Sequence, residues 1–178
     1  VPDAVIGDMD SLDQVARARV PADRLHRIAE QDSTDFDKAL SRIAAPLVIG
    51  HGFLGARLDH QLAAVTVLAV RADRRCVLVG RRDVAFLLPP RLSLDLPEGT
   101  RVSLYPLGPV CGRSTGLRWP IAGLDFAPGG RIGTSNEATG PVTLEMAAPV
   151  MVAILPVACL PAVRAALAAT PEGWPVRG

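Results

Sequence analysis

The chain has 178 residues, of which 49% are hydrophobic and 21% are charged, so it is long enough for one large or two small globular domains. This composition excludes a disordered or fibrous protein. The 19 basic and 18 acidic residues leave a formal net charge of +1. This balance excludes a protein that wraps nucleic acid and a polybasic membrane anchor, and it favours a small-molecule ligand. Lys38 is the only lysine, so arginine is abundant and an arginine cluster is by itself weak evidence of function.

Helical and strand patterns alternate in the first segment of the chain. Residues 1–7 resemble the end of a βα unit, and residues 34–44 predict an amphipathic helix capped by Ser33 or Thr34. A buried strand at 46–50, a helix at 59–70 and a strand at 76–79 follow. This alternation predicts an α/β domain with a parallel sheet over residues 1–80.

The remaining segment, residues 81–178, has a different pattern. Pro- and Gly-rich turns separate runs of strand length, and no helical pattern interrupts them before a short helix at 161–169. These runs are 84–88, 101–105, 130–135, 141–145 and 150–155. They predict an all-β sandwich resembling a jelly roll.

Cysteine spacing and hydropathy indicate the compartment. Cys76, Cys111 and Cys159 form no disulfide or metal pattern, so we expect core thiols in a reducing, cytoplasmic environment. The uncharged run 147–163 is shorter than the ~20 residues of a membrane-spanning helix and is interrupted by prolines. We expect a buried strand followed by a helix there, and no membrane segment.

Acidic residues are concentrated in two segments, 7–11 and 31–37, each where a predicted strand leads into a helix. In a parallel sheet these junctions lie at the carboxyl edge, where ligands bind. Asp8 and Asp10 are one residue apart, and Asp35 could join them as an oxygen ligand of Mg²⁺ holding phosphates. Alternatively, these aspartates cap helices or interact with the helix dipole.

Residues 50–55 form a GxGxxG pattern after a strand, with Asp73 near the spacing expected for a ribose ligand, as in dinucleotide-dependent oxidoreductases. Arg57, Asp59 and His60 follow at once, and a carboxylate there would repel a pyrophosphate. A glycine-rich turn is the simpler interpretation. His60 beside Asp59 could contact a phosphate or belong to a helix-capping pair.

Trp119 is unusual because it lies in a polar turn within a chain that is only 4% aromatic. Its ring could stack on a flat cationic heterocycle, or it could close the end of the sandwich. Ser135 and Asn136 offer short hydrogen-bonding groups, although this pair is also common in turns.

Five segments in this order resemble the thiamine pyrophosphokinase (thiamine diphosphokinase) family. They are Ile6-Gly-Asp-Met-Asp-Ser11, Gln31-Asp-Ser-Thr-Asp-Phe36, Gly52-x-x-Gly-x-Arg-x-Asp-His60, Thr115-Gly-Leu-Arg-Trp119 and Thr134-Ser-Asn136. The resemblance extends from about residue 2 to about residue 155. It implies an α/β catalytic domain followed by a β-sandwich that helps bind thiamine, in agreement with the periodicity.

The resemblance also implies an activity and its residues. A pyrophosphoryl group would pass from ATP to the thiamine hydroxyl, giving thiamine diphosphate and AMP, with Mg²⁺ required. The enzyme would be a homodimer with sites between subunits, so that Trp119 serves the partner's catalytic domain. The implied metal and catalytic residues are Asp8, Asp10 and Asp35, with Asp59 as a further catalytic residue. The implied nucleotide-site residues are Gln31, Asp32, Thr34, Arg57 and His60. The implied thiamine-binding residues are Trp119, Ser135 and Asn136.

The chain departs from the family pattern at its beginning. The family's first strand and its Asp-Gly-Gly-Ala segment have no counterpart, and position 1 is Val, so we expect another segment to precede it. A truncated, non-catalytic module that binds thiamine or its diphosphate is therefore an alternative to the enzyme. The dinucleotide-dependent oxidoreductase is a second alternative. No function is assigned to the Pro-rich tail 156–178.

Overall fold

Two parallel strands and two α-helices form the beginning of the chain in the computed structural model, which describes residues 1–9, 13–28, 32–55, 57–171 and 173–175. Residue contacts divide the chain into two units, Val1–Ala44 and Ala45–Gly178. The predicted boundary near residue 80 falls between two strands that pair within the second unit.

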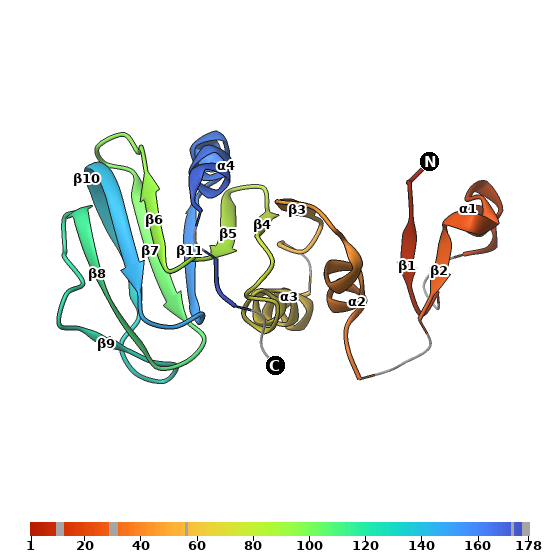
Figure 1. The fold of residues 1–178 in the computed structure, drawn as a ribbon, viewed down its shortest axis with the longest axis horizontal. Coiled ribbons are helices and arrows are strands. Elements are labelled where there is room, and N and C mark those ends of the chain that lie inside the picture. Colours follow the sequence, from red (N-terminus) through yellow and green to blue (C-terminus); the bar gives the residue numbers. More distant parts are fainter. Residues whose placement is uncertain (10–12, 29–31, 56, 172, 176–178) are drawn as a thin grey trace. The chain divides into compact units, whose positions relative to one another are not determined.

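The first unit is a βαβ arrangement followed by a helix (Figure 1). Strand β1 (Val5–Gly7) pairs in parallel with β2 (Leu25–Arg27), with Val5 opposite Leu25. Helix α1 (Gln14–Arg19) and a 3-10 turn, η1 (Ala22–Arg24), lie between them in sequence. Helix α2 (Asp35–Arg42) follows, which confirms the helix predicted over 34–44.

The second unit begins with another parallel pair. Strands β3 (Val48–His51) and β4 (Cys76–Val79) are connected through α3 (Leu58–Val70), as the sequence predicts. Strand β5 (Asp83–Leu87) then pairs antiparallel with β4. The connection from β4 to β5 is too short for a crossover, so the chain has to reverse direction. The parallel strands of the described residues therefore lie in two separate sheets, the second of which is mixed.

The mixed sheet has nine strands in the order β3-β4-β5-β11-β7-β10-β8-β9, with β6 also paired to β10 (Figure 1). The strands that complete it are β6 (Arg91–Leu94), β7 (Arg101–Pro106), β8 (Val110–Leu117), β9 (Asp125–Phe126), β10 (Gly133–Met146) and β11 (Met151–Pro156). Every pairing beyond β4 is antiparallel. The chain thus has an antiparallel β region after an α/β segment, in the order that the sequence predicts.

Strand β10 corrects one prediction. The sequence predicts two strands, at 130–135 and 141–145, but one continuous strand begins at Gly133 within the first and runs through the whole of the second, with Gly140 at φ 136° between them. The first half of β10 pairs with β7, and its second half pairs with β6 and β8. A register shift against β8 between Ala138 and Thr143 allows the strand to continue where Gly140 and Pro141 suggested a turn.

Apolar side chains from the β strands form the main core of the second unit. Among the largest fully buried ones are Phe86, Leu104, Leu144 and Met151. Helix α4 (Leu160–Ala169), predicted over 161–169, packs against β6 and contributes Val163 and Leu167 to this core. The run 147–163 is therefore a strand followed by the start of a helix, as predicted.

All three cysteines are free, but only some of the core-thiol prediction is correct. Cys76 is buried, and burial raises the pKa of its thiol to about 12. Cys159 is half-buried, whereas Cys111 is exposed because alternate residues of β8 point away from the core. No helix in the described residues has both the length and the hydropathy to cross a membrane.

Candidate active site

The two acidic segments of the first unit meet at the end of β1. Asp8 follows the last residue of β1, and Asp35 is the first residue of α2. The Asp8 N–H donates a hydrogen bond of 3.2 Å to Asp35 Oδ1. A Cβ atom on Gly7 would lie 2.8 Å from the same oxygen, so glycine leaves the space that the Asp35 carboxylate occupies. The structure thus brings Asp8 and Asp35 together.

Lys38 also belongs to this site, although no sequence motif predicted it there. Its side chain is 2% exposed, and its Nζ lies 3.7 Å from Asp35 Oδ1, one turn earlier on α2. A buried lysine is rare unless it is paired. The available signal was a single lysine three residues after a predicted metal ligand. Lys38 places a positive charge beside a carboxylate expected to bind phosphates through a metal.

Thr34 has a structural role at the start of α2. Its Oγ1 accepts a hydrogen bond of 3.2 Å from the Asp37 N–H, so Thr34, one of the two residues predicted to cap this helix, is the N-cap. Asp32 is exposed two residues earlier. Asp10 and Gln31, the other predicted residues of these segments, lie outside the described residues. Nucleotide contacts of Asp32 and Thr34 stay predictions.

The donor chemistry of this site fits Mg²⁺. Asp8 and Asp35 supply hard carboxylate oxygens, and Mg²⁺ in nucleotide enzymes is commonly held by one or two carboxylates plus substrate phosphates. Among the described residues, no three His, Cys, Asp or Glu side chains converge. The third predicted ligand, Asp10, is not among them. A pair of carboxylates therefore suits a metal whose remaining ligands come from substrate and water.

In the second unit, a glycine-rich loop connects β3 to α3. Gly52 and Gly55 have φ values of 87° and 101°, which explains why glycine occupies both positions. Arg57 Nη2 and Asp59 Oδ2 lie 2.5 Å apart as an exposed ion pair. The hydrogen bond from Arg57 lowers the pKa of Asp59, and the His60 backbone N–H contributes to this shift. Arg57 and Asp59 are thus already organised as a pair at the start of α3.

Trp119 is held through its main chain by Asn136. The Asn136 Nδ2 donates a hydrogen bond of 2.7 Å to the Trp119 carbonyl, and Asn136 Oδ1 accepts one of 3.2 Å from the Trp119 N–H. The same oxygen accepts the Glu137 N–H. Asn136 is buried, whereas the Trp119 residue is 54% exposed. Most of the Asn136 amide is therefore used to orient the tryptophan.

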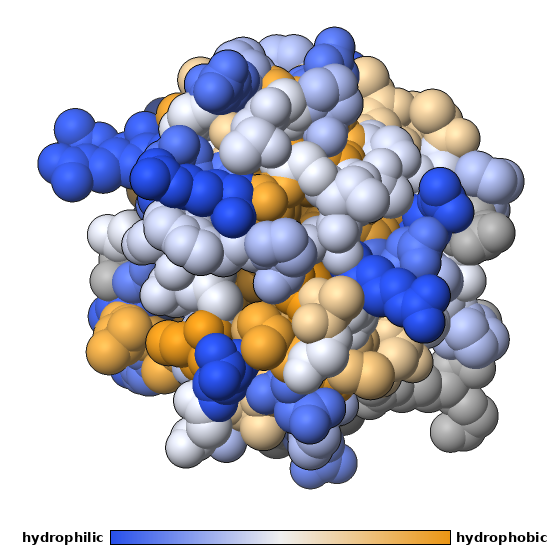
Figure 2. Space-filling view, turned by 90° about the vertical axis from the view of Figure 1, so that its left-hand side faces the viewer, coloured by the Kyte–Doolittle hydropathy of each residue, from blue (hydrophilic) through white to orange (hydrophobic). Residues whose placement is uncertain are grey.

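The exposed Trp119 ring lies beside a shallow hollow of about 180 Å³. Its lining residues are Trp119, Ile121, Leu124, Phe126, Arg131, Ile132, Gly133, Thr134 and Asn136. Figure 2 shows the end of the unit that carries β8 and β10, where hydrophobic residues lie between hydrophilic ones. The Arg118 guanidinium lies 5.1 Å from the centre of the Trp119 ring, so the ring already stacks with one cation.

Ser135 lies next to this hollow but does not belong to its lining. It has a φ of 63°, and its N–H donates a hydrogen bond of 3.0 Å to Ser103 Oγ. Trp119 and Asn136 are thus brought together, with Ser135 adjacent in sequence and exposed. Ligand contacts of these three residues stay predictions.

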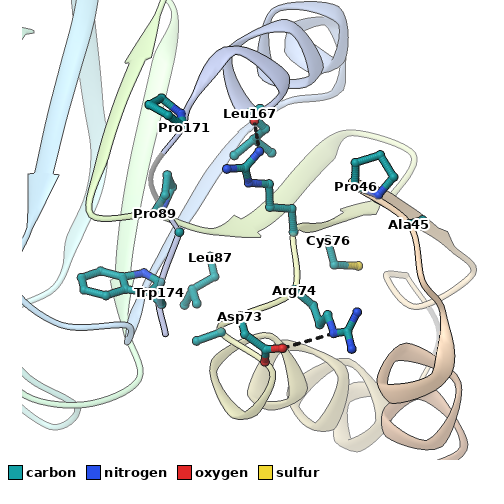
Figure 3. Close-up of a pocket in the computed structure, with 13 residues that line it drawn as sticks. Ala45, Pro46, Asp73, Arg74, Cys76, Leu87, Pro89, Leu167, Pro171 and Trp174 are labelled. Carbon is teal, nitrogen blue, oxygen red and sulfur yellow. Dashed lines mark hydrogen bonds and ion pairs between the residues drawn. The ribbon is translucent and has the colours of Figure 1, made fainter. Parts of the chain in front are cut away.

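A second cavity of about 350 Å³ contains none of the residues that the family resemblance implies, but it includes Asp73, the candidate ribose ligand of the oxidoreductase alternative (Figure 3). Its lining includes Asp73 and Arg74, which form an ion pair of 3.2 Å, together with Pro171 and Trp174 from the tail. Arg75 donates hydrogen bonds to the carbonyls of Leu167 and Thr170. The charged groups there have partners within the protein, so we interpret the cavity as the place where the tail joins the core.

Two family models match successive segments of the chain. Residues 1–79 match the catalytic domain of thiamin pyrophosphokinase, and residues 90–151 match the vitamin B1 binding domain of the same enzyme. The chain belongs to the thiamine pyrophosphokinase family. Thiamine pyrophosphokinase 1 of Oryza sativa subsp. japonica is 30% identical over 154 residues, which cover 76% of this chain and 58% of that protein. The chain therefore spans less than two thirds of the length of this relative.

Solved structures of the family have a similar fold. The thiamin pyrophosphokinase of Geobacillus thermodenitrificans is 27% identical, with a TM-score of 0.69 over 87% of this chain and 77% of that one. The thiamine pyrophosphokinase of Bacillus subtilis is 24% identical, with a TM-score of 0.72 over 88% of this chain and 79% of that one. These similarities place the chain in the fold of the family.

Proposed function

We propose that this chain catalyses the thiamine pyrophosphokinase reaction, in which ATP and thiamine give AMP and thiamine diphosphate. The observation that carries the proposal is the match of both domains of one enzyme family, in order, to residues 1–79 and 90–151. The oxygen of the thiamine hydroxyl would attack the β-phosphorus of ATP. A new O–P bond forms, the bond from the β-phosphorus to the oxygen that bridges it to the α-phosphorus breaks, and AMP leaves with that oxygen.

The acidic site of the first unit would hold the reacting phosphates. Asp8 and Asp35, with Asp10, would bind Mg²⁺, which supplies positive charge to the polyphosphate when bound. Lys38, 3.7 Å from Asp35 Oδ1, keeps this carboxylate in place and adds a further positive charge. Phosphoryl transfer depends mainly on such positioning and charge neutralisation, so the protein needs no covalent nucleophile.

Asp35 and Asp59 are the candidate acceptors of the hydroxyl proton. The hydrogen bond from Arg57 lowers the pKa of Asp59, and a carboxylate with a lowered pKa is a weaker base. This weakens the case for Asp59 as the acceptor. Arg57 and Asp59 would then act as a pair that contacts the nucleotide, together with His60, Asp32, Thr34 and Gln31.

Trp119 would contact the thiamine through its exposed ring face. A flat cationic heterocycle is a suitable partner for an indole ring, since cation–π attraction and stacking act together. Asn136 would position Trp119 and has one Nδ2 N–H left for the pyrimidine, with Ser135 next to it. We also propose a cytoplasmic homodimer, in which Trp119 serves the catalytic domain of the partner subunit.

The test is AMP release from ATP and Mg²⁺ with and without thiamine, using this chain and any longer form of the protein that contains it. Thiamine-dependent AMP formation supports the enzyme. Thiamine binding without AMP release by either form would instead support the non-catalytic module. Binding of NAD(H) or FAD without either activity would support the oxidoreductase alternative suggested by residues 50–55.

A further inference from the structure

A cavity of about 660 Å³ in the second unit contains charged residues that the proposed reaction has not used. Its volume lies within the range of roughly 300–1,000 Å³ that is typical of small-molecule sites. The apolar residues of its lining are Leu54, Val65, Ala85 and Ile154. The polar residues of its lining are Gln61, Arg81, Arg82 and Asp83, and two glycines, Gly55 and Gly80, complete it.

The turn between β4 and β5 presents Arg81 and Arg82 on a fixed backbone. The Gly80 N–H donates a hydrogen bond of 2.8 Å to the Asp83 carbonyl, closing the turn around the two arginines. The Arg82 carbonyl accepts another, also of 2.8 Å, from the Val157 N–H. A Cβ atom on Gly80 would lie 3.0 Å from the Leu54 Cβ, so the turn packs closely against the β3–α3 loop.

The charge of the two arginines is not neutralised by the described residues. Neither Arg81 nor Arg82 forms an ion pair among them, and Asp83 of the same turn pairs with Arg101. Several other arginines do have carboxylate partners, namely Arg57, Arg74, Arg91 and Arg118. Because arginine is common in this chain, a single arginine says little about ligand binding. Two arginines without ion-pair partners among the described residues, both lining one cavity, are stronger evidence. Such a cavity attracts anions.

The position of the cavity also indicates a substrate. Strands β3 and β4 are parallel, and Leu54 and Gly80 lie in the segments that follow their carboxyl ends. Ligands of parallel sheets bind beyond these ends. We propose that Arg81 and Arg82 bind the phosphate groups of the nucleotide. The two arginines would give the protein a higher affinity for a nucleoside polyphosphate than for a nucleoside monophosphate. This inference rests on the function proposed above and adds two substrate-binding residues to it.

The test compares binding of ATP and of AMP by isothermal titration calorimetry in the presence of Mg²⁺. The variants are Arg81→Ala, Arg82→Ala, the double alanine variant and the double lysine variant. Arg164→Ala is the matched control, because Arg164 is an exposed arginine on α4 away from the cavity lining. Circular dichroism and the melting temperature show whether each variant is folded.

We expect the double alanine variant to raise the Kd of ATP by roughly 10- to 100-fold and the Kd of AMP much less, because charge-assisted hydrogen bonds to phosphate are lost. The lysine variant should recover some of this affinity, and the control should bind as the unchanged protein does. Added salt should weaken ATP binding more in the unchanged protein than in the alanine variant.

The outcomes separate this inference from the proposed function. If the folded double alanine variant binds ATP as tightly as the unchanged protein does, and thiamine-dependent AMP formation persists, the role of the arginines is wrong and the enzyme stands. If ATP binds through the arginines but no AMP forms with thiamine, the nucleotide site stands and the proposed reaction is wrong. If the unchanged protein binds no ATP, both are overturned.

Discussion

At the scale of single residues, Asp35 connects the fold of the first unit to its proposed chemistry. One of its oxygens accepts the Asp8 N–H and also lies 3.7 Å from the Lys38 Nζ. Gly7 leaves room for the carboxylate because any side chain at that position would contact it. A carboxylate held by two neighbours keeps its position without a metal, which suits a site that acts by alignment.

We expect Asp35→Asn to lower kcat by about 100-fold or more, because asparagine retains a hydrogen-bond acceptor but loses the charge for metal binding and the capacity to accept a proton. The thiamine affinity should change little. Steady-state kinetics and thiamine titration measure the two effects. Asp23→Asn, at an exposed aspartate of the same unit, is the control. Unchanged kcat in a folded Asp35→Asn variant would remove Asp35 from the site.

Trp119→Ala should raise the KM for thiamine by roughly 5- to 30-fold with a smaller effect on kcat, since the variant loses a stacking surface for a cationic ring. Trp119→Phe should recover much of this loss because the ring face is retained. Initial rates at varied thiamine and saturating ATP provide the measurement. A change only in the melting temperature, with KM unaltered, would show that the ring has a structural role alone.

At the scale of elements, strands β8 and β10 approach closely next to Trp119. Gly116 of β8 has a φ of 73°, and a Cβ atom there would clash with the Pro141 carbonyl oxygen of β10. The register between the two strands shifts at this point. The glycine of the Thr115–Trp119 segment is therefore required by the backbone, and it sets the direction in which the following residues leave the strand.

We expect Gly116→Ala to destabilise the protein by about 2–5 kcal/mol, which combines left-handed backbone strain with a steric clash. Gly123→Ala separates the two causes. Gly123 also has a positive φ, of 77°, but has no atom within 4 Å of its Cβ position. It should cost only about 1 kcal/mol. Urea unfolding followed by circular dichroism compares them, and equal losses would show that the clash at Gly116 is relieved by relaxation.

At the scale of the whole molecule, the tail completes the core of the second unit. The Trp174 Nε1 donates a hydrogen bond of 2.7 Å to the Leu88 carbonyl, and its ring packs against the core cluster. Arg75 fixes the end of α4 through the carbonyls of Leu167 and Thr170, at 2.9 and 2.6 Å. Residues from the beginning and the end of the unit are thus joined beside the cavity in Figure 3.

Trp174→Ala should lower the free energy of unfolding by about 2–4 kcal/mol, since both packing and a hydrogen bond are lost. Trp174→Phe should cost about 1 kcal/mol, because the ring remains and the Nε1 donor does not. Urea unfolding measures both, and the KM for thiamine serves as a control that should not change. Stabilities equal to that of the unchanged protein would mean that the tail contributes nothing to the unit.

Much of the fold follows from local patterns. The apolar periodicity predicted α2 and α3, and the hydroxyls of Ser33 and Thr34 predicted a cap for α2, which Thr34 provides. Strands β2, β6, β8 and β9 were missed because they are short or rich in small polar residues. Such strands are stabilised by their partners and carry little signal of their own. The predicted division into a catalytic domain over residues 1–80 and a thiamine-binding domain over residues 81–178 stays a prediction about function.

The sequence by itself determined the main helices α2, α3 and α4, several of the strands, the acidic and tryptophan segments and the membership of the family, because these depend on residue type and spacing along the chain. Tertiary structure decided the features that depend on distant segments. Among these are the single strand β10, the burial of Lys38 beside Asp35, the Asn136 contacts that hold Trp119, and the cavity beside Arg81 and Arg82. Strand pairing and side-chain burial are set by neighbours in space, so local periodicity does not encode them.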